Sequence, residues 1–206
     1  PSCEVLPAAE EMFAHVFDGV DTDAHTHEVL QEPTLEGMLA HLLCHMRDNH
    51  RGLCGKLVAE GFLKQNNPSG AIEACKKILN GNKDAGWNSA MAPAYWQALL
   101  DANKLGEVQG LLDKGVTASE QSVSIMACIR RGDLLVKKNE HKLAIKDGYL
   151  RAVLLYRGPD EARAEALYRA GEAFEKLGQN TYAERMRDEL RSKYSRTSWG
   201  KKLLGG

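Results

Sequence analysis

Small residues recur at a fixed offset in the second half of the chain. Gly132 is followed twelve residues later by Ala144, and Gly171 is followed twelve residues later by Ala183. A glycine or alanine on each of two antiparallel helices lets their backbones approach closely, and hairpins that follow one another build a stack. The spacing therefore predicts two consecutive helical hairpins between residues 124 and 194.

The same offset extends toward the N-terminus. The predicted crossing positions on the first helices are Ala59, Ala98, Gly132 and Gly171, and those on the second helices are Ala71, Gly110, Ala144 and Ala183. The steps between hairpins are 39, 34 and 39 residues. We expect all eight positions to lie where paired helices nearly touch, because a larger side chain there would push the helices apart.

Apolar residues recur at helical spacing, and no stretch alternates with period two for long enough to form a strand. Aromatic residues make up only 6% of the chain, which also favours packed helices. We therefore predict an all-α fold, with an irregular, partly helical segment over 1–33 and a helical-hairpin solenoid over 34–206. The predicted hairpins cover 52–80, 91–115, 124–156 and 161–195, and a short terminal cap follows. Within the second hairpin, Gly106 is expected to break the first helix.

The last hairpin, ALYRAGEAFEKLGQNTYAERMRDELRSKYSRTSWGKK, resembles a tetratricopeptide (TPR) repeat. The family has a period near 34 and small residues twelve apart, with an aromatic residue three positions after the first. Phe62 and Phe174 fit that aromatic position, Leu135 is acceptable, and Asp101 departs from it. The ending looks like TPR domains of bacterial envelope proteins, such as the Tol–Pal accessory protein and the outer-membrane assembly lipoproteins, although Ser195 stands where those usually have proline.

The resemblance implies a right-handed superhelix whose concave face is formed by the first helices. The family's groove positions, carried over onto this chain, are Lys56, Glu60, Lys64, Tyr95, Leu99, Asn103, Ile129, Asp133, Lys137, Tyr168, Glu172 and Lys176. Their mixture of both charges, tyrosines and aliphatic residues suits an extended peptide or a partner's helix. We therefore expect a non-catalytic protein–protein interaction scaffold, or a subunit of a larger assembly, that binds another protein through this groove.

Two alternatives stay open. His41, Cys44 and His45 would share one helix face within the His- and Cys-rich segment 25–54, where they could hold zinc or another soft metal. No second pair completes a standard zinc set, so our first expectation is a chain without metal or cofactor. The other alternative is a self-assembling repeat protein that forms a homo-oligomer.

Other function classes find little support in the sequence. The chain has 27 basic and 28 acidic residues and a net charge of −1, which gives no electrostatic case for a nucleic-acid partner. It contains no phosphate-binding glycine loop and no catalytic cysteine signature, so we do not expect an enzyme. No window is apolar enough for a membrane span. Five cysteines at irregular spacing favour a reducing, cytoplasmic location, and a periplasmic one is the alternative if an export signal was removed before Pro1.

Overall fold

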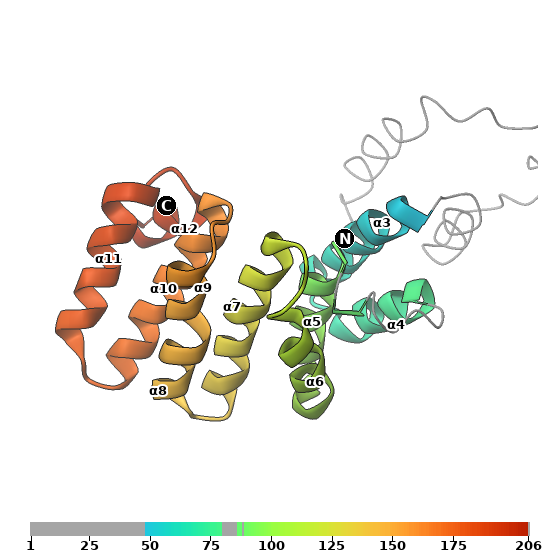
Figure 1. Ribbon diagram of the computed structural model, residues 1–206, viewed down its shortest axis with the longest axis horizontal. Coiled ribbons are helices and arrows are strands. Elements are labelled where there is room, and N and C mark those ends of the chain that lie inside the picture. Colours follow the sequence, from blue (N-terminus) through green and yellow to red (C-terminus); the bar gives the residue numbers. More distant parts are fainter. Residues whose placement is uncertain (1–47, 80–85, 88, 206) are drawn as a thin grey trace, which may run out of the picture. The chain divides into compact units, whose positions relative to one another are not determined.

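All regular structure in the described part of the chain is helical. The computed structural model describes residues 48–79, 86–87 and 89–205 (Figure 1). The chain divides into two compact units, Pro1–His45 and Met46–Gly206, and the helices described here belong to the second. The all-α prediction is therefore confirmed for the residues that the structure describes. The predicted segment 1–33 and its boundary lie outside the described residues.

Helices follow one another in pairs, each joined by a short turn, and a last short helix follows. In chain order the elements are α3 (Asp48–Lys64), α4 (Pro68–Leu79), α5 (Ala92–Asp101), α6 (Leu105–Gly115), α7 (Gln121–Lys137), α8 (His141–Leu143), the π-helix η2 (Ala144–Tyr149), α9 (Leu150–Leu155), α10 (Asp160–Lys176), α11 (Asn180–Tyr194) and α12 (Ser198–Leu203).

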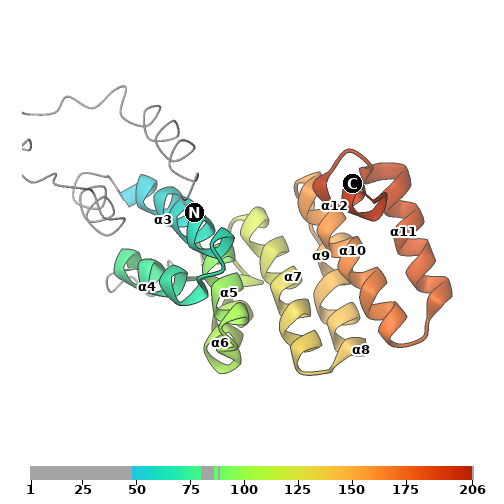
Figure 2. The ribbon, with the colours of Figure 1, turned by 180° about the vertical axis from the view of Figure 1, so that it is seen from behind.

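Neighbouring pairs pack against one another (Figures 1 and 2). The first helices α3, α5, α7 and α10 contact one another in that order, and each of the last three also packs against the second helix of the preceding pair. α8, η2 and α9 together form the second helix of the third pair. The helix α12 lies against α10 and α11. Among the described residues, no helix has the length and hydrophobicity needed to cross a bilayer.

One backbone turn is repeated in every described pair. Asn66, Asn103, Asn139 and Gly178 have φ values of 54°, 57°, 62° and 69°, and each stands two residues after its first helix ends. Asn and Gly adopt this left-handed conformation most easily, and it caps the last carbonyls of a helix. The next residue donates its backbone N–H to the carbonyl five residues earlier, at 2.8 to 2.9 Å. These turns recur at intervals of 37, 36 and 39 residues and define an internal register.

The register corrects the prediction for the second pair. The position seven residues before the turn is small in the other three pairs, but in α5 it is Trp96 rather than the expected Ala98. Trp96 is fully buried, and its Nε1 donates to the carbonyl of Gly86 at 3.0 Å. A large indole ring therefore occupies the position at which the other three pairs have a small residue. The predicted close backbone approach in the second pair does not form there.

Gly110 was expected to face Ala98 across this crossing, and that prediction is wrong. Gly110 is exposed, and a Cβ built on it would meet no atom within 4 Å. The predicted break at Gly106 is also wrong, because α5 ends before the turn at Asn103 and Gly106 lies inside α6. Asn103 could end the helix because asparagine tolerates positive φ.

The closest backbone approach in the third pair involves a glycine that the twelve-residue spacing did not identify. A Cβ on Gly148 would lie 2.5 Å from the Gly132 Cα and 2.7 Å from the Gly132 backbone nitrogen. Ala144 is buried as predicted, but Gly148 and the ring of Tyr149 are the groups that lie against Gly132. Gly148 lies in η2, where the wider π-helical turn changes which residues face α7.

The crossing in the fourth pair is looser. A Cβ on Gly171 would lie 3.7 Å from the carbonyl oxygen of Ala183, its predicted partner, which is an ordinary van der Waals contact. Gly171 and Ala183 are both buried, so the predicted pairing is correct, but room for one methyl group remains.

Candidate functional site

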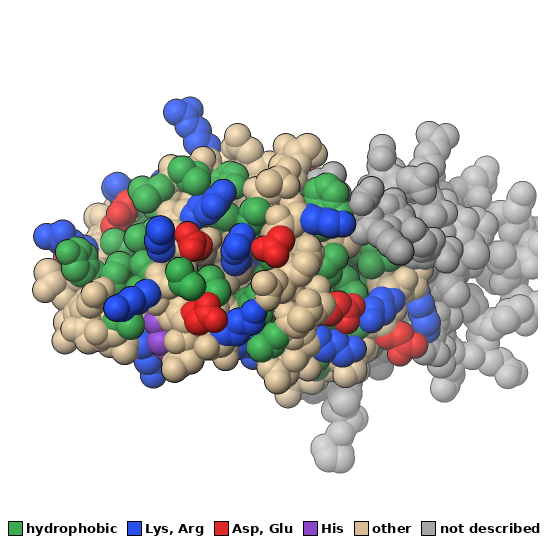
Figure 3. All heavy atoms as spheres, turned by 60° about the horizontal axis from the view of Figure 1, so that its bottom comes forward, with side chains coloured by type: hydrophobic (Ala, Val, Ile, Leu, Met, Phe, Trp, Pro, Cys, Tyr) green, Lys and Arg blue, Asp and Glu red, His purple; other side chains and the backbone are tan. Residues whose placement is uncertain are grey.

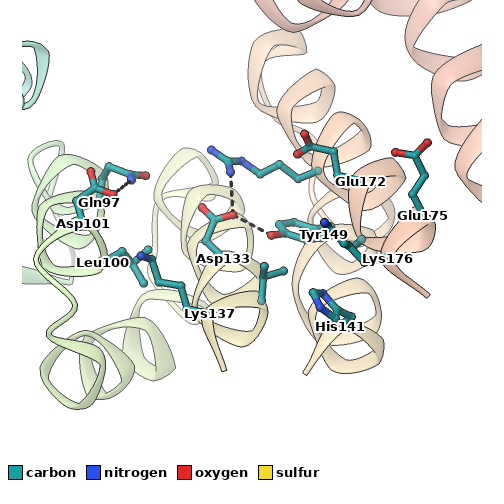
Figure 4. Close-up of a pocket in the computed structure, with 13 residues that line it drawn as sticks. Gln97, Leu100, Asp101, Asp133, Lys137, His141, Tyr149, Glu172, Glu175 and Lys176 are labelled. Carbon is teal, nitrogen blue, oxygen red and sulfur yellow. Dashed lines mark hydrogen bonds and ion pairs between the residues drawn. The ribbon is translucent and has the colours of Figure 1, made fainter. Parts of the chain in front are cut away.

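A pocket of about 590 Å³ opens across α5, α7 and α10, and α8 and η2 contribute to its wall (Figure 4). Each of the three first helices supplies a residue together with those three and four positions later, which lie on one helical face. These residues are Gln97, Leu100 and Asp101 on α5, Asp133, Val136 and Lys137 on α7, and Glu172, Glu175 and Lys176 on α10.

The repeated turn explains why these residues meet. Gln97, Asp133 and Glu172 each stand six residues before the left-handed residue of their own pair. Equal distance from an equivalent turn places them at equivalent positions on successive helices. The pocket is therefore built by the repeat itself. The remaining lining residues are His141, Tyr149, Arg169 and Ala173.

Four of the predicted groove residues line this pocket: Asp133, Lys137, Glu172 and Lys176. All four come from the third and fourth pairs, where the small-residue spacing and the turn register agree. The other lining residues on these helices are not among the predicted ones, because the TPR resemblance supplies only three groove positions from each hairpin.

The predicted positions on α5 lie elsewhere because their register is wrong by two residues. Tyr95 and Leu99 are buried in the core, with exposed fractions of 3% and 0%. Asn103 is the left-handed turn residue itself. The structure instead brings Gln97 and Asp101 to the pocket, and the positive φ of Asn103 is the feature that gives the correct register.

The other predicted groove residues do not line the pocket. Ile129 is fully buried in the core. On α3, Lys56 and Glu60 lie 3.9 Å apart on the surface, and Lys64 is exposed. Tyr168 packs against Trp199 of α12, with ring centroids 5.1 Å apart.

A buried ionic network forms one side of the pocket. The Arg130 Nη1 atom lies 2.8 Å from Asp133 Oδ2 and 2.7 Å from Glu165 Oε1. Arg169 lies 3.2 Å from Asp133 and 2.9 Å from Glu165, and Tyr149 donates its hydroxyl to Asp133 at 2.9 Å (Figure 4). These two arginines and two carboxylates connect α7 to α10, and their charges cancel within the protein.

The network shifts the pKa values of Glu165, Arg130 and Tyr149. Burial alone would raise the pKa of Glu165, but the guanidinium groups of Arg130 and Arg169 lower it below its ordinary value of 4.5. Burial would lower the pKa of Arg130, and the carboxylates of Glu165 and Asp133 raise it instead. Burial and the charge of Asp133 both raise the pKa of Tyr149. Glu165 and Arg130 therefore stay ionised and Tyr149 stays neutral at neutral pH, which is the behaviour of a structural network.

Arg169 also connects the pocket to the end of the chain. Its guanidinium carbon lies 5.2 Å from the ring centroid of Trp199, and the Lys202 Nζ lies 4.7 Å from the same ring. Cation–π contacts of this kind hold a side chain in one orientation as well as attracting it. The short helix α12 thus fixes the position of an arginine in the pocket wall.

Several polar groups that line the pocket have few partners among the described residues. Asp101, Lys137, Glu172 and Lys176 form no ion pair with any residue that the structure describes, although Asp101 accepts a hydrogen bond from the Gln97 side chain at 2.8 Å. The Nδ1 atom of His141 is shielded from solvent and has no hydrogen-bond partner in the part of the chain that the structure describes, while its Nε2 lies 3.1 Å from Asn139 Oδ1. The face of the molecule drawn in Figure 3 carries both signs of charge among hydrophobic side chains.

Two buried cysteines, Cys75 and Cys128, lie in the core of the described helices. Burial raises the pKa of the Cys75 thiol to about 12 and also raises that of Cys128, so neither is an activated nucleophile. Within the described ranges, no group of three His, Cys, Asp or Glu side chains could hold a metal ion. The candidate ligands His41, Cys44 and His45 lie outside those ranges.

Comparisons with known proteins found no match to this chain among family models, curated proteins or solved structures.

Proposed function

We propose that this chain is a TPR-like right-handed helical-hairpin solenoid that serves as a non-catalytic interaction scaffold or assembly subunit. In this proposal the pocket across α5, α7 and α10 is part of a concave groove, and a peptide or helix of another protein lies in it. The observation that carries the proposal is that three successive first helices supply the same three positions to one pocket.

Two further features support a binding role. The volume of about 590 Å³ falls within the range of ligand pockets, roughly 300–1,000 Å³. The pocket wall is held by a buried ionic network, so its side chains are ordered before a partner arrives, which reduces the entropy lost on binding.

Two matched variants test the proposal. Gln97→Trp places a large ring in the pocket, whereas Gln109→Trp makes the same change on the exposed face of α6. Partners are captured from cells of the source organism on immobilised chain, purified, and titrated against both variants. We expect Gln97→Trp to weaken binding at least about tenfold, because it fills the groove, and Gln109→Trp to bind as wild type does. Equal binding by both variants would remove the groove from the proposal.

A further inference from the structure

The charges of the pocket divide into two groups. Asp133 and Arg169 neutralise one another inside the buried network, and Glu175 pairs with Arg187 of α11. Their charges are already satisfied by the protein itself. They hold the wall in place and offer little net charge to a partner.

The second group consists of Asp101, Lys137, Glu172 and Lys176, which have no ion-pair partner among the described residues. It contains two cations and two anions. Figure 4 shows Lys137 extending from α7 toward α5, and Lys176 on the opposite side of the pocket, where His141 and Tyr149 also lie. Charges of both signs are thus distributed across the width of the pocket.

This arrangement selects against partners of a single sign. A strongly acidic segment would bring its carboxylates against Asp101 and Glu172, and a strongly basic one would bring its cations against both lysines. Like charges brought together in an interface disfavour binding, whereas complementary charges favour it and fix the register. A segment with both signs can satisfy all four groups.

Building on the proposed function, we infer that the pocket recognises a peptide segment of mixed charge, whose acidic side chains meet Lys137 and Lys176 and whose basic side chains meet Asp101 and Glu172. His141 also lines the pocket, and its Nδ1 has no hydrogen-bond partner among the described residues. Asp101 and Glu172 disfavour polyanionic partners, including nucleic acid, through the same like-charge contacts.

The probe for this inference is a phage-displayed library of random twelve-residue peptides, selected against the immobilised full-length chain. We expect the enriched peptides to contain both acidic and basic residues. Synthetic versions of them are then titrated by fluorescence anisotropy against wild type and against Lys137→Glu combined with Lys176→Glu. This double variant should bind them at least about tenfold more weakly, and its own selection should enrich basic peptides.

The control is Lys114→Glu combined with Lys146→Glu, which makes the same change in net charge at exposed lysines outside the pocket. It should bind the selected peptides as wild type does. If Lys137→Glu with Lys176→Glu loses helicity by circular dichroism, the neutral pair Lys137→Gln and Lys176→Gln is used instead, with a smaller loss expected.

The outcomes separate this inference from the proposed function. Enriched peptides of one sign, or equal affinity of the pocket and control variants, would overturn the mixed-charge inference while leaving a peptide-binding scaffold in place. No enrichment of any peptide, together with no partner that distinguishes Gln97→Trp from Gln109→Trp, would overturn both.

Discussion

The contact between α7 and η2 makes a single methyl group a sensitive probe of the hairpin packing. In Gly148→Ala, the new Cβ would lie 2.5 Å from the Gly132 Cα and 2.7 Å from its backbone nitrogen. Because non-bonded carbon atoms pack at about 3.5–4.0 Å, the two helices must separate by roughly 1 Å. Neither atom belongs to a side chain that could rotate away, so the backbone itself must move.

The cost of that movement sets the expected loss of stability. Overpacking in a well-packed core costs about 1–3 kcal/mol, and the backbone clash places Gly148→Ala in the upper part of this range. The better helix propensity of alanine returns up to about 1 kcal/mol. We therefore expect a net loss of about 1–2 kcal/mol in the free energy of unfolding, which lowers the Tm by roughly 2–8 °C for a chain of this size.

Two other glycines provide matched controls in the same chain. A Cβ on Gly171 would make only ordinary contacts at 3.7 Å, and one on Gly110 would meet nothing within 4 Å. Both lie inside helices, so alanine should stabilise each by about 0.5–1 kcal/mol. Urea unfolding followed by circular dichroism measures all three. A Gly148→Ala variant as stable as wild type would contradict the close approach of η2 to α7. A Gly110→Ala variant destabilised to the same degree as Gly148→Ala would also contradict it.

Three further predictions concern the buried network and the last helix. Arg130→Met leaves Glu165 buried with one fewer cation and should lower the free energy of unfolding by about 3–5 kcal/mol. In urea titrations, the double variant with Glu165→Gln should recover part of this loss. Full additivity of the two single-variant losses would contradict coupling between Arg130 and Glu165. The pKa of Glu165 is lowered in the folded state, so its ionised form contributes stability that is fully present above its ordinary pKa of 4.5 and is lost as pH falls through the lowered value. Wild type should therefore lose more stability below pH 4.5 than Glu165→Gln does, and parallel pH profiles would contradict this. Trp199→Ala removes the ring that Arg169 and Lys202 contact, and should speed hydrogen exchange in α12 more than in α7; unchanged exchange in α12 would show that the ring does not hold it.

Sequence patterns located most of the helical hairpins because their signals act locally. Breakers such as Gly178 and the Asn–Asn–Pro run beginning at Asn66 end helices through backbone geometry that any fold must respect. Small residues located Gly132 and Gly171 correctly at the third and fourth crossings, but only Gly171 meets its predicted partner Ala183, because Gly132 meets Gly148 instead of Ala144. The four groove residues taken from these two pairs accordingly line the pocket.

The second pair shows why the rest could not be predicted. Its crossing position holds Trp96, so size alone gave a register that was wrong by two residues, and Tyr95 and Leu99 were placed on the surface instead of in the core. The positive φ of Asn103 gives the correct register in the structure. The sequence alone does not reveal this φ, because asparagine also occurs in many other backbone conformations. The π-helix that brings Gly148 to Gly132 depends on tertiary packing, which no spacing rule reports.

Photocrosslinking from the pocket tests the central claim most directly, namely that equivalent positions on α5, α7 and α10 contact one partner. A benzophenone amino acid replaces Gln97, Lys137 or Glu172 in turn, and Lys146 and Tyr182 serve as positions on other surfaces. After irradiation in cells of the source organism, all three pocket positions should give an adduct with the same protein, and the other two should not. Adducts that form only from Lys146 or Tyr182, or three unrelated adducts from the pocket, would contradict the account.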